Sequence, residues 1–177
     1  MIKYVALFRG INVGGNKKVN MEALRNMMAS VGYKNIKTIL NSGNLIFESS
    51  KTSEGNLIKI IEENFTKTFG FESKVMVRTI SEIELFLNLD PFKNIQQDKN
   101  TQLYVTFLPE KKKSSLNIPY STPEKDFQIL QIVEREVFWL INKLNAKTVD
   151  AMAFIEKEFG KNVTTRNWNT VEKIVRA

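Results

Sequence analysis

The chain has 177 residues, of which 42% are apolar and 25% charged, and it contains neither cysteine nor histidine. A chain of this length buries about two-thirds of the surface that it exposes when unfolded, so a substantial core is expected. The missing residue types exclude disulfide scaffolds, thiolate nucleophiles, iron–sulfur clusters and catalytic dyads or triads that use imidazole. They also exclude thiolate or imidazole metal sites, and we predict neither a metal site nor a cofactor.

Positive charge is concentrated near the N-terminus. The chain has 26 basic and 19 acidic side chains, and residues 1–50 hold seven of the basic and two of the acidic ones. A basic surface attracts phosphorylated ligands and polyanions, but a solvated lysine-rich surface without any ligand has the same composition. No apolar stretch approaches the roughly 18 residues of a membrane-spanning helix. We therefore expect a cytoplasmic protein with no membrane partner.

The first eighty residues predict a ferredoxin-like unit. Residues 4–8 are apolar at every position, which is typical of a strand that is covered on both faces. Asn20 is expected to cap a first helix, and Ser53 a second helix that ends at Gly70. Three further strands are predicted at residues 36–40, 45–47 and 71–77. The resulting order, β-α-β-β-α-β, defines the ferredoxin-like unit that we expect over residues 1–80.

The second half has a similar but less regular pattern. It predicts a short helix with a capping box at Ser81-Glu82-Ile83-Glu84, a strand at 103–108, a hairpin over 127–141 with its turn at 134–136, a helix capped by Thr148, a short strand at 163–165 and a last helix. We interpret residues 81–177 as a degraded second copy of the first unit, packed against it. No linker composition separates the halves, so residues 1–177 are predicted to form a single compact α+β body with antiparallel sheets and helices.

Two polar, glycine-bearing segments are predicted to meet at one end of the first sheet. Residues 10–18 follow the first strand, and residues 41–44 join the second and third strands. In a ferredoxin-like unit the first and second strands run parallel, so both segments leave the sheet at the same end. Glycines, cations and the backbone N–H groups of a helix start all favour an anion there. Turn chemistry without a ligand explains the same residue types, and this alternative stays open.

Two known motifs come close to these segments. Residues 10–15 have the glycine spacing of a Walker A loop, but Asn16 stands in place of its lysine and Lys18 in place of its serine or threonine. Residues 4–8 resemble the first strand of RNA-recognition modules, whereas residues 44–47 lack the paired stacking aromatics. We exclude the Walker A loop and do not expect sequence-specific RNA recognition. Binding of a nucleic-acid backbone through the basic end stays open.

A third polar segment, residues 162–170, precedes the last predicted helix. It gathers hydroxyls, amides, one guanidinium and one indole within nine residues. A capped helix with Trp168 as a core anchor accounts for this composition. The alternative hypothesis is that Arg166 and Trp168 join the first two segments around one pocket, with Trp168 as an apolar or stacking wall.

The same three segments carry a family resemblance. The stretch from Val5 to Lys17, the Ser42-Gly43-Asn44 turn and residues 165–171 resemble the bacterial proteins grouped as domain of unknown function 1697. The resemblance extends from the first residues to the last, and it implies an α+β protein with ferredoxin-like elements. It implies no activity and no catalytic residues.

The candidate ligand-binding residues come from all three segments: Arg9, Asn12, Gly14, Gly15, Asn16, Lys17, Ser42, Gly43, Asn44, Thr165, Arg166, Asn167 and Trp168. We expect a binding module for a phosphorylated metabolite, a nucleotide or a nucleic-acid backbone. One alternative is an enzyme for phosphoryl or acyl transfer that uses a carboxylate or lysine, for which Glu22 is the nearest acid. The other alternative is a structural or protein-interaction role without a small-molecule site. No catalytic residue is assigned.

Overall fold

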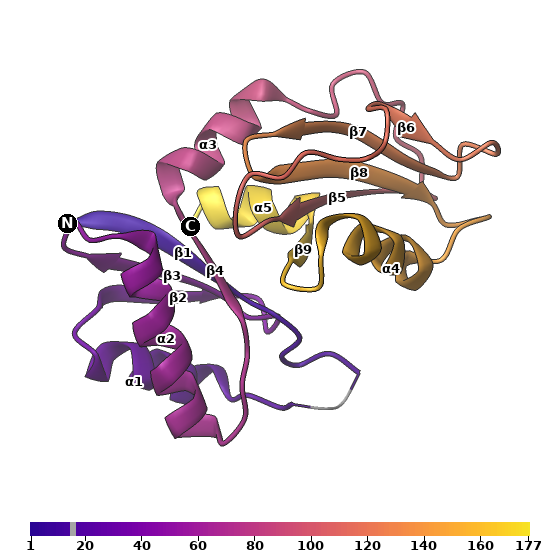
Figure 1. Cartoon of the computed structure of the whole chain (residues 1–177). Coiled ribbons are helices and arrows are strands. Elements are labelled where there is room, and N and C mark those ends of the chain that lie inside the picture. The colour runs from indigo at the N-terminus through magenta and orange to yellow at the C-terminus, as the bar shows by residue number, and fades with distance from the viewer. Residues whose placement is uncertain (15–16) are drawn as a thin grey trace. The chain divides into compact units, whose positions relative to one another are not determined.

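The computed structural model describes residues 1–14 and 17–177 and has an α+β architecture with antiparallel sheets (Figure 1). Its elements are β1 (Ile2–Phe8), α1 (Met21–Ser30), β2 (Lys34–Ile39), β3 (Asn44–Ser49), α2 (Glu54–Phe69), β4 (Val75–Thr79), α3 (Ile80–Leu89), β5 (Thr101–Phe107), β6 (Tyr120–Ser121), β7 (Phe127–Val133), β8 (Glu136–Asn142), α4 (Thr148–Phe159), β9 (Thr164–Asn167) and α5 (Trp168–Val175). Among the described residues, no helix has the length and apolar character needed to cross a bilayer.

The chain divides into two compact units. The first unit comprises Met1–Leu85 together with Glu172–Ala177, and the second comprises Phe86–Val171. The boundary between the units falls between Leu85 and Phe86, within α3, whereas the sequence predicts it between residues 80 and 81. The expected single compact body stays a prediction, and each unit is described by itself below.

The sheet of the first unit has the strand order β2-β3-β1-β4, with antiparallel neighbours throughout. Helices α1 and α2 cover one face of this sheet (Figure 1). The element order β-α-β-β-α-β expected from the sequence is therefore present. In this arrangement the loop after β1 and the β2–β3 turn leave the sheet at the same end.

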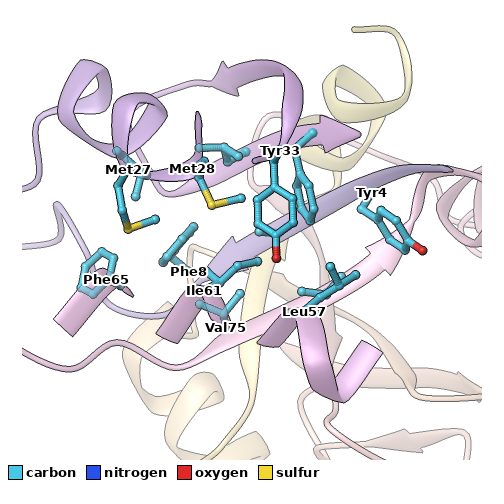
Figure 2. Close-up of a cluster of buried hydrophobic side chains, with 14 of the residues drawn as sticks. Tyr4, Phe8, Met27, Met28, Tyr33, Leu57, Ile61, Phe65 and Val75 are labelled. Carbon is cyan, nitrogen blue, oxygen red and sulfur yellow. The ribbon is translucent and has the colours of Figure 1, made fainter. Parts of the chain in front are cut away.

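Strand β1 is buried on both faces, as its uninterrupted apolar run predicts. Tyr4, Ala6 and Phe8 belong to the core beneath α1 and α2. Figure 2 shows Tyr4 and Phe8 in this core. Val5 and Leu7, on the opposite face of the sheet, are fully buried as well. Burial of each large apolar side chain stabilises the folded chain by about 1.5–3 kcal/mol, so β1 anchors the end from which the polar loop departs.

The predicted caps of α1 and α2 are confirmed. Asn20 Oδ1 accepts hydrogen bonds from the backbone N–H groups of Glu22 and Ala23. Ser53 Oγ accepts one from Asn56 N, and Gly70 ends α2 in the left-handed conformation. These caps satisfy backbone groups that a helix end otherwise leaves without a partner.

Three local predictions are wrong. The capping box of α3 is formed by Thr79 and Glu82 instead of Ser81 and Glu84, because Glu82 Oε2 accepts from Thr79 N at 2.7 Å and Thr79 Oγ1 accepts from Glu82 N. Thr148 is not the cap of α4, whose N-cap is Lys147 without a side-chain hydrogen bond. The fourth strand begins at Val75 and not at residue 71.

The second unit has the strand order β6-β7-β8-β5-β9. Its core lies between this sheet and α4, and it is centred on Trp139, which stacks on Tyr104 with ring centroids 4.4 Å apart. The hairpin of β7 and β8 turns at Glu134 and Arg135, close to the predicted position. Strand β6 was not predicted from the sequence, because a two-residue pairing leaves no periodicity.

Candidate functional site

The loop after β1 and the β2–β3 turn meet at one end of the first sheet, and Asn12 connects them. Asn12 Nδ2 donates to the backbone oxygens of Asn41 at 2.8 Å and Val19 at 3.0 Å. Asn12 Oδ1 accepts from Val19 N at 2.7 Å. The positive φ of 55° at Asn12 is one that asparagine tolerates better than most residues. Asn12 therefore acts as a clamp that fixes the shape of the loop.

The β2–β3 turn is held by its own residues. Asn44 is fully buried, and its Nδ2 donates to Ile39 O at 2.9 Å and to Ser42 Oγ at 3.0 Å. A Cβ atom on Gly43 would lie 2.8 Å from Ile11 Cγ1 and 2.9 Å from Phe8 Cβ. Gly43 therefore serves the packing of the loop, and Ser42 and Asn44 serve the turn.

A hollow of about 810 Å³ lies beside this clamp. We call it the N-terminal hollow, and its lining residues are Asn12, Lys18, Val19, Asn20, Met21, Glu22 and Asn41. It combines one ammonium, one carboxylate and the side-chain amides of Asn20 and Asn41 with the apolar side chains of Val19 and Met21. The Asn12 amide also lines the hollow but is already used by the clamp. Such a mixture suits a small ligand that carries both charge and hydrogen-bonding groups.

The other predicted cations of this end are partly engaged by the protein. Lys17 Nζ lies 5.6 Å from the centroid of the Phe71 ring, which is within the range of a cation–π contact. The backbone of Arg9 is fixed on both sides, because Arg9 N donates to Lys74 O at 2.8 Å and Arg9 O accepts from Ser73 Oγ at 2.9 Å.

The predicted glycine pair is described only in part. Gly14 has a φ of +63° and no atom within 4 Å of a Cβ placed on it, so it serves the turn and leaves open space beside the backbone. Gly15 and Asn16 lie outside the described residues.

The third predicted segment lies in the second unit and makes internal contacts there. Arg166 is buried, and its Nη1 donates to Thr164 Oγ1 at 2.9 Å and to Thr165 O at 2.8 Å. Burial lowers the pKa of the Arg166 guanidinium to about 10. The hydroxyls of Thr165 and Thr106 lie 2.7 Å apart.

The remainder of this segment starts α5. Trp168 is largely buried and makes edge contacts with the rings of Phe92 and Phe138, with centroids 5.1 and 6.0 Å away. Asn167 Oδ1 accepts from Asn169 N at 3.0 Å at the start of α5. Both features agree with a capped helix that has an aromatic anchor. The hypothesis that Arg166 and Trp168 meet the N-terminal loop stays a prediction.

Sequence reasoning missed most of the lining of the N-terminal hollow. Asn12 was among the predicted ligand-binding residues, whereas Lys18, Val19, Asn20, Met21 and Asn41 were not. The sequence predicts Asn20 as a helix cap, and it offers Glu22 as the carboxylate of the enzyme alternative and not as a ligand-binding residue. The signal that could have identified Lys18, Val19 and Asn20 is their position in the chain, between the loop after β1 and the start of α1. Among the described residues, no group of three or more acidic side chains is placed to hold a metal ion.

Two antiparallel sheets with helices on them define an α+β protein. The chain belongs to the family described as "Protein of unknown function (DUF1697)", whose model matches residues 1–138. This confirms the family and the resemblance of the first two segments, whereas residues 165–171 lie outside the matched range. No curated protein matches the chain. A solved structure of the conserved bacterial protein SP0830 from Streptococcus pneumoniae is similar, with 23% sequence identity and a TM-score of 0.74. The match covers 99% of this chain and 97% of that one, and it supports the fold.

Proposed function

We propose that the first unit binds a small phosphorylated ligand in the N-terminal hollow. The observation that carries this proposal is the hollow of about 810 Å³ in which Lys18, Glu22 and three asparagines line one space. The Lys18 ammonium is the group that would pair with a phosphate, and a charge-assisted hydrogen bond of this kind contributes about 1.5–3 kcal/mol. Arg9 and Lys17, on the same end of the unit, add to the positive potential.

Glu22 determines which phosphorylated ligand is favoured. Its carboxylate lines the same space as the Lys18 ammonium. A carboxylate accepts hydrogen bonds from hydroxyl groups, and it repels further negative charge. The combination therefore favours a ligand with one phosphate and several hydroxyls, such as a sugar phosphate or a mononucleotide. A nucleic-acid backbone, with a negative charge on every nucleotide, fits this space less well.

We further infer that the second unit is a degraded second copy of the first. In support, the spatial order β7-β8-β5-β9 in the second sheet matches the order β2-β3-β1-β4 in the first. In this comparison β5 corresponds to β1, β7 to β2, β8 to β3 and β9 to β4. Tyr4 on β1 is the cross-strand partner of Phe47 and stacks on it at 5.5 Å between centroids. Tyr104 on β5 is likewise the partner of Trp139 and stacks on it.

Two buried arginines add to the correspondence between the units. Arg78 on β4 is the cross-strand partner of Val5, and its Nη1 donates to Val77 O at 2.8 Å. Arg166 on β9 is the partner of Val105, and its Nη1 also donates at 2.8 Å to the carbonyl oxygen of the preceding residue. The same residue type, register and hydrogen bond at matching strands support a common origin. Between β5 and β7, residues 108–126 with the short β6 occupy the place of α1.

Thermal unfolding with added ligands tests the proposed site. We expect ribose 5-phosphate and adenosine monophosphate to raise the melting temperature more than a single-stranded oligonucleotide at equal phosphate concentration. Lys18→Ala should weaken binding about tenfold, which corresponds to about 1.4 kcal/mol. Lys59→Ala removes the same charge from the exposed face of α2 and should leave binding unchanged. Equal loss in both variants, or no shift with any probe, would contradict the proposal.

A further inference from the structure

A second hollow lies within the second unit, on residues that the proposed function does not use. It has a volume of about 160 Å³ and is lined by Gln97 and Lys99 before β5, by the first three residues of β5, by Lys143 just after β8, and by Asn167 and Asn169 at the junction of β9 and α5. Its lining is polar except for Leu103 and includes no acidic residue. This volume is large enough for one small anion such as phosphate together with a few water molecules.

The cations of the second hollow are Lys99 and Lys143. Their segments are joined, because Lys143 N donates to Asn100 O at 2.9 Å. Among the described residues, neither lysine forms an ion pair with a carboxylate. Two ammonium groups on one small hollow repel each other, and an anion bound between them would remove that repulsion.

Asp98, the chain neighbour of Lys99, is already engaged. Asp98 Oδ1 accepts from Asn100 N, Thr101 N and Thr101 Oγ1, at 2.9, 2.7 and 2.7 Å. The hydrogen bond from the Thr101 hydroxyl, together with those from the backbone, lowers the pKa of Asp98 below its ordinary value. Asp98 therefore stabilises the turn before β5 and is not among the residues that line the hollow.

Side-chain amides complete the donor set. The Tyr104 hydroxyl donates to Gln102 Oε1 at 2.6 Å, which leaves the amide nitrogen of Gln102 as the donor. Asn167 Oδ1 is occupied by Asn169 N, which in the same way leaves Asn167 Nδ2 as the donor. Donors thus outnumber acceptors, a property typical of a site for an anion. We propose that the second hollow binds a single phosphate group, either inorganic phosphate or the terminal group of a phosphate monoester.

NMR on the ¹⁵N-labelled full chain tests this second site. Titration with inorganic phosphate, and separately with glycerol 3-phosphate, should produce saturable shifts in the side-chain amide signals of Gln102 and Asn167. Saturation with inorganic phosphate alone would identify the bare anion as the ligand, whereas saturation with both would identify the phosphate monoester class. Absence of saturable shifts with both probes would overturn the proposal.

A pair of double variants gives the control for net charge. Lys99→Ala with Lys143→Ala should weaken binding at least tenfold, whereas Lys157→Ala with Lys161→Ala, two exposed lysines of the same unit, should change it less than twofold. Equal weakening by both pairs would overturn the proposal. Lys18→Ala should leave the phosphate-induced shifts of Gln102 and Asn167 intact. A failure of the proposed site in the second hollow is therefore distinguishable from a failure of the proposed site in the N-terminal hollow.

Discussion

The β2–β3 turn of the first unit and the β7–β8 turn of the second occupy matching places but use their side chains differently. Phe8 N donates to Gly43 O in one unit, and Leu108 N donates to Arg135 O in the other, both at 2.8 Å. The first turn carries no charged side chain and adjoins the N-terminal hollow. In the second turn, Glu134 forms an ion pair with Lys111.

This difference indicates where a charged ligand can be bound. Opposite charges of the protein neutralise each other at the end of the second unit, and Arg135 Nη1 also approaches Pro109 O at 3.5 Å. At the end of the first unit, by contrast, amide hydrogen bonds hold the backbone, so the Lys18 charge is not needed to stabilise the turn. Under the proposed function, the same strand framework carries a binding end in the first unit, whereas the matching end of the second unit is closed by its own charges.

The largest expected effect is at Gly43, where the second unit has an arginine. Gly43→Ala should destabilise the chain by about 2–4 kcal/mol, because the new Cβ would contact Ile11 and Phe8 and the φ of +75° strains any side chain. Urea unfolding measures this loss. Gly14→Ala, with a φ of +63° but open space around it, is the matched control and should lose only about 1–2 kcal/mol. Similar losses at both positions would show that packing does not require Gly43.

The Asn12 clamp is the next test, since it organises the first unit's loop. Asn12→Ala should cost about 1–3 kcal/mol, because it leaves Val19 N and two carbonyl oxygens without their partner. Hydrogen exchange at the Val19 amide should accelerate. Asn41→Ala is the control, because only the backbone oxygen of Asn41 takes part in the clamp. Unchanged Val19 exchange in the Asn12 variant would refute the clamp.

A smaller, pH-dependent effect is expected at Glu158 in the second unit. Desolvation raises the pKa of Glu158, but hydrogen bonds from the Ser114 hydroxyl and from Ser115, with the charge of Lys112, outweigh it, so the pKa lies below its ordinary value of 4.5. The folded state therefore binds protons less readily than the unfolded state. The ionised Glu158 carboxylate therefore stabilises the folded state fully above about pH 4.5, and this stabilisation is lost as the pH falls through the lowered pKa. The melting temperatures of the wild type and Glu158→Gln should converge between pH 5 and pH 3, and a constant difference would contradict this.

The smallest effect is expected at the ion pair of the β7–β8 turn. Both Lys111 and Glu134 are strongly exposed, with side-chain exposures of 69% and 61%. Exposed ion pairs contribute about 0–1 kcal/mol, so Lys111→Ala should change the free energy of unfolding by less than about 1 kcal/mol. A double-mutant cycle with Glu134→Ala isolates the pair, and a coupling well above this range would show that the end of the second unit depends on its charges.

The sequence predicted local structure best where one residue determines it. Asn20, Ser53 and Gly70 were correctly assigned to helix ends, because a cap depends on groups within a few positions of the chain. The Ser81 capping box was wrong because Thr79 and Glu82 offer a second capping box two residues earlier. The Thr148 cap was wrong because α4 begins at Thr148 itself and its N-cap, Lys147, makes no side-chain hydrogen bond. The continuous apolar run of β1 correctly indicated a strand that is buried on both faces.

The candidate site was predictable only at the level of segments. Strand order shows that the loop after β1 and the β2–β3 turn meet, and they do. It does not show that Asn12 is consumed by the clamp or that Gly43 is required by Ile11, because both depend on packing between distant residues. Lys18 was treated as one charge among several, although it lines the N-terminal hollow directly.

The most direct test of the N-terminal site is a titration of the ¹⁵N-labelled full chain with ribose 5-phosphate, followed by NMR. We predict saturable shifts at the backbone amides of Val19 and Glu22 and at the side-chain amide of Asn41, and their loss in Lys18→Ala. Saturable binding that leaves these three signals unchanged, or no binding at all, would contradict the account.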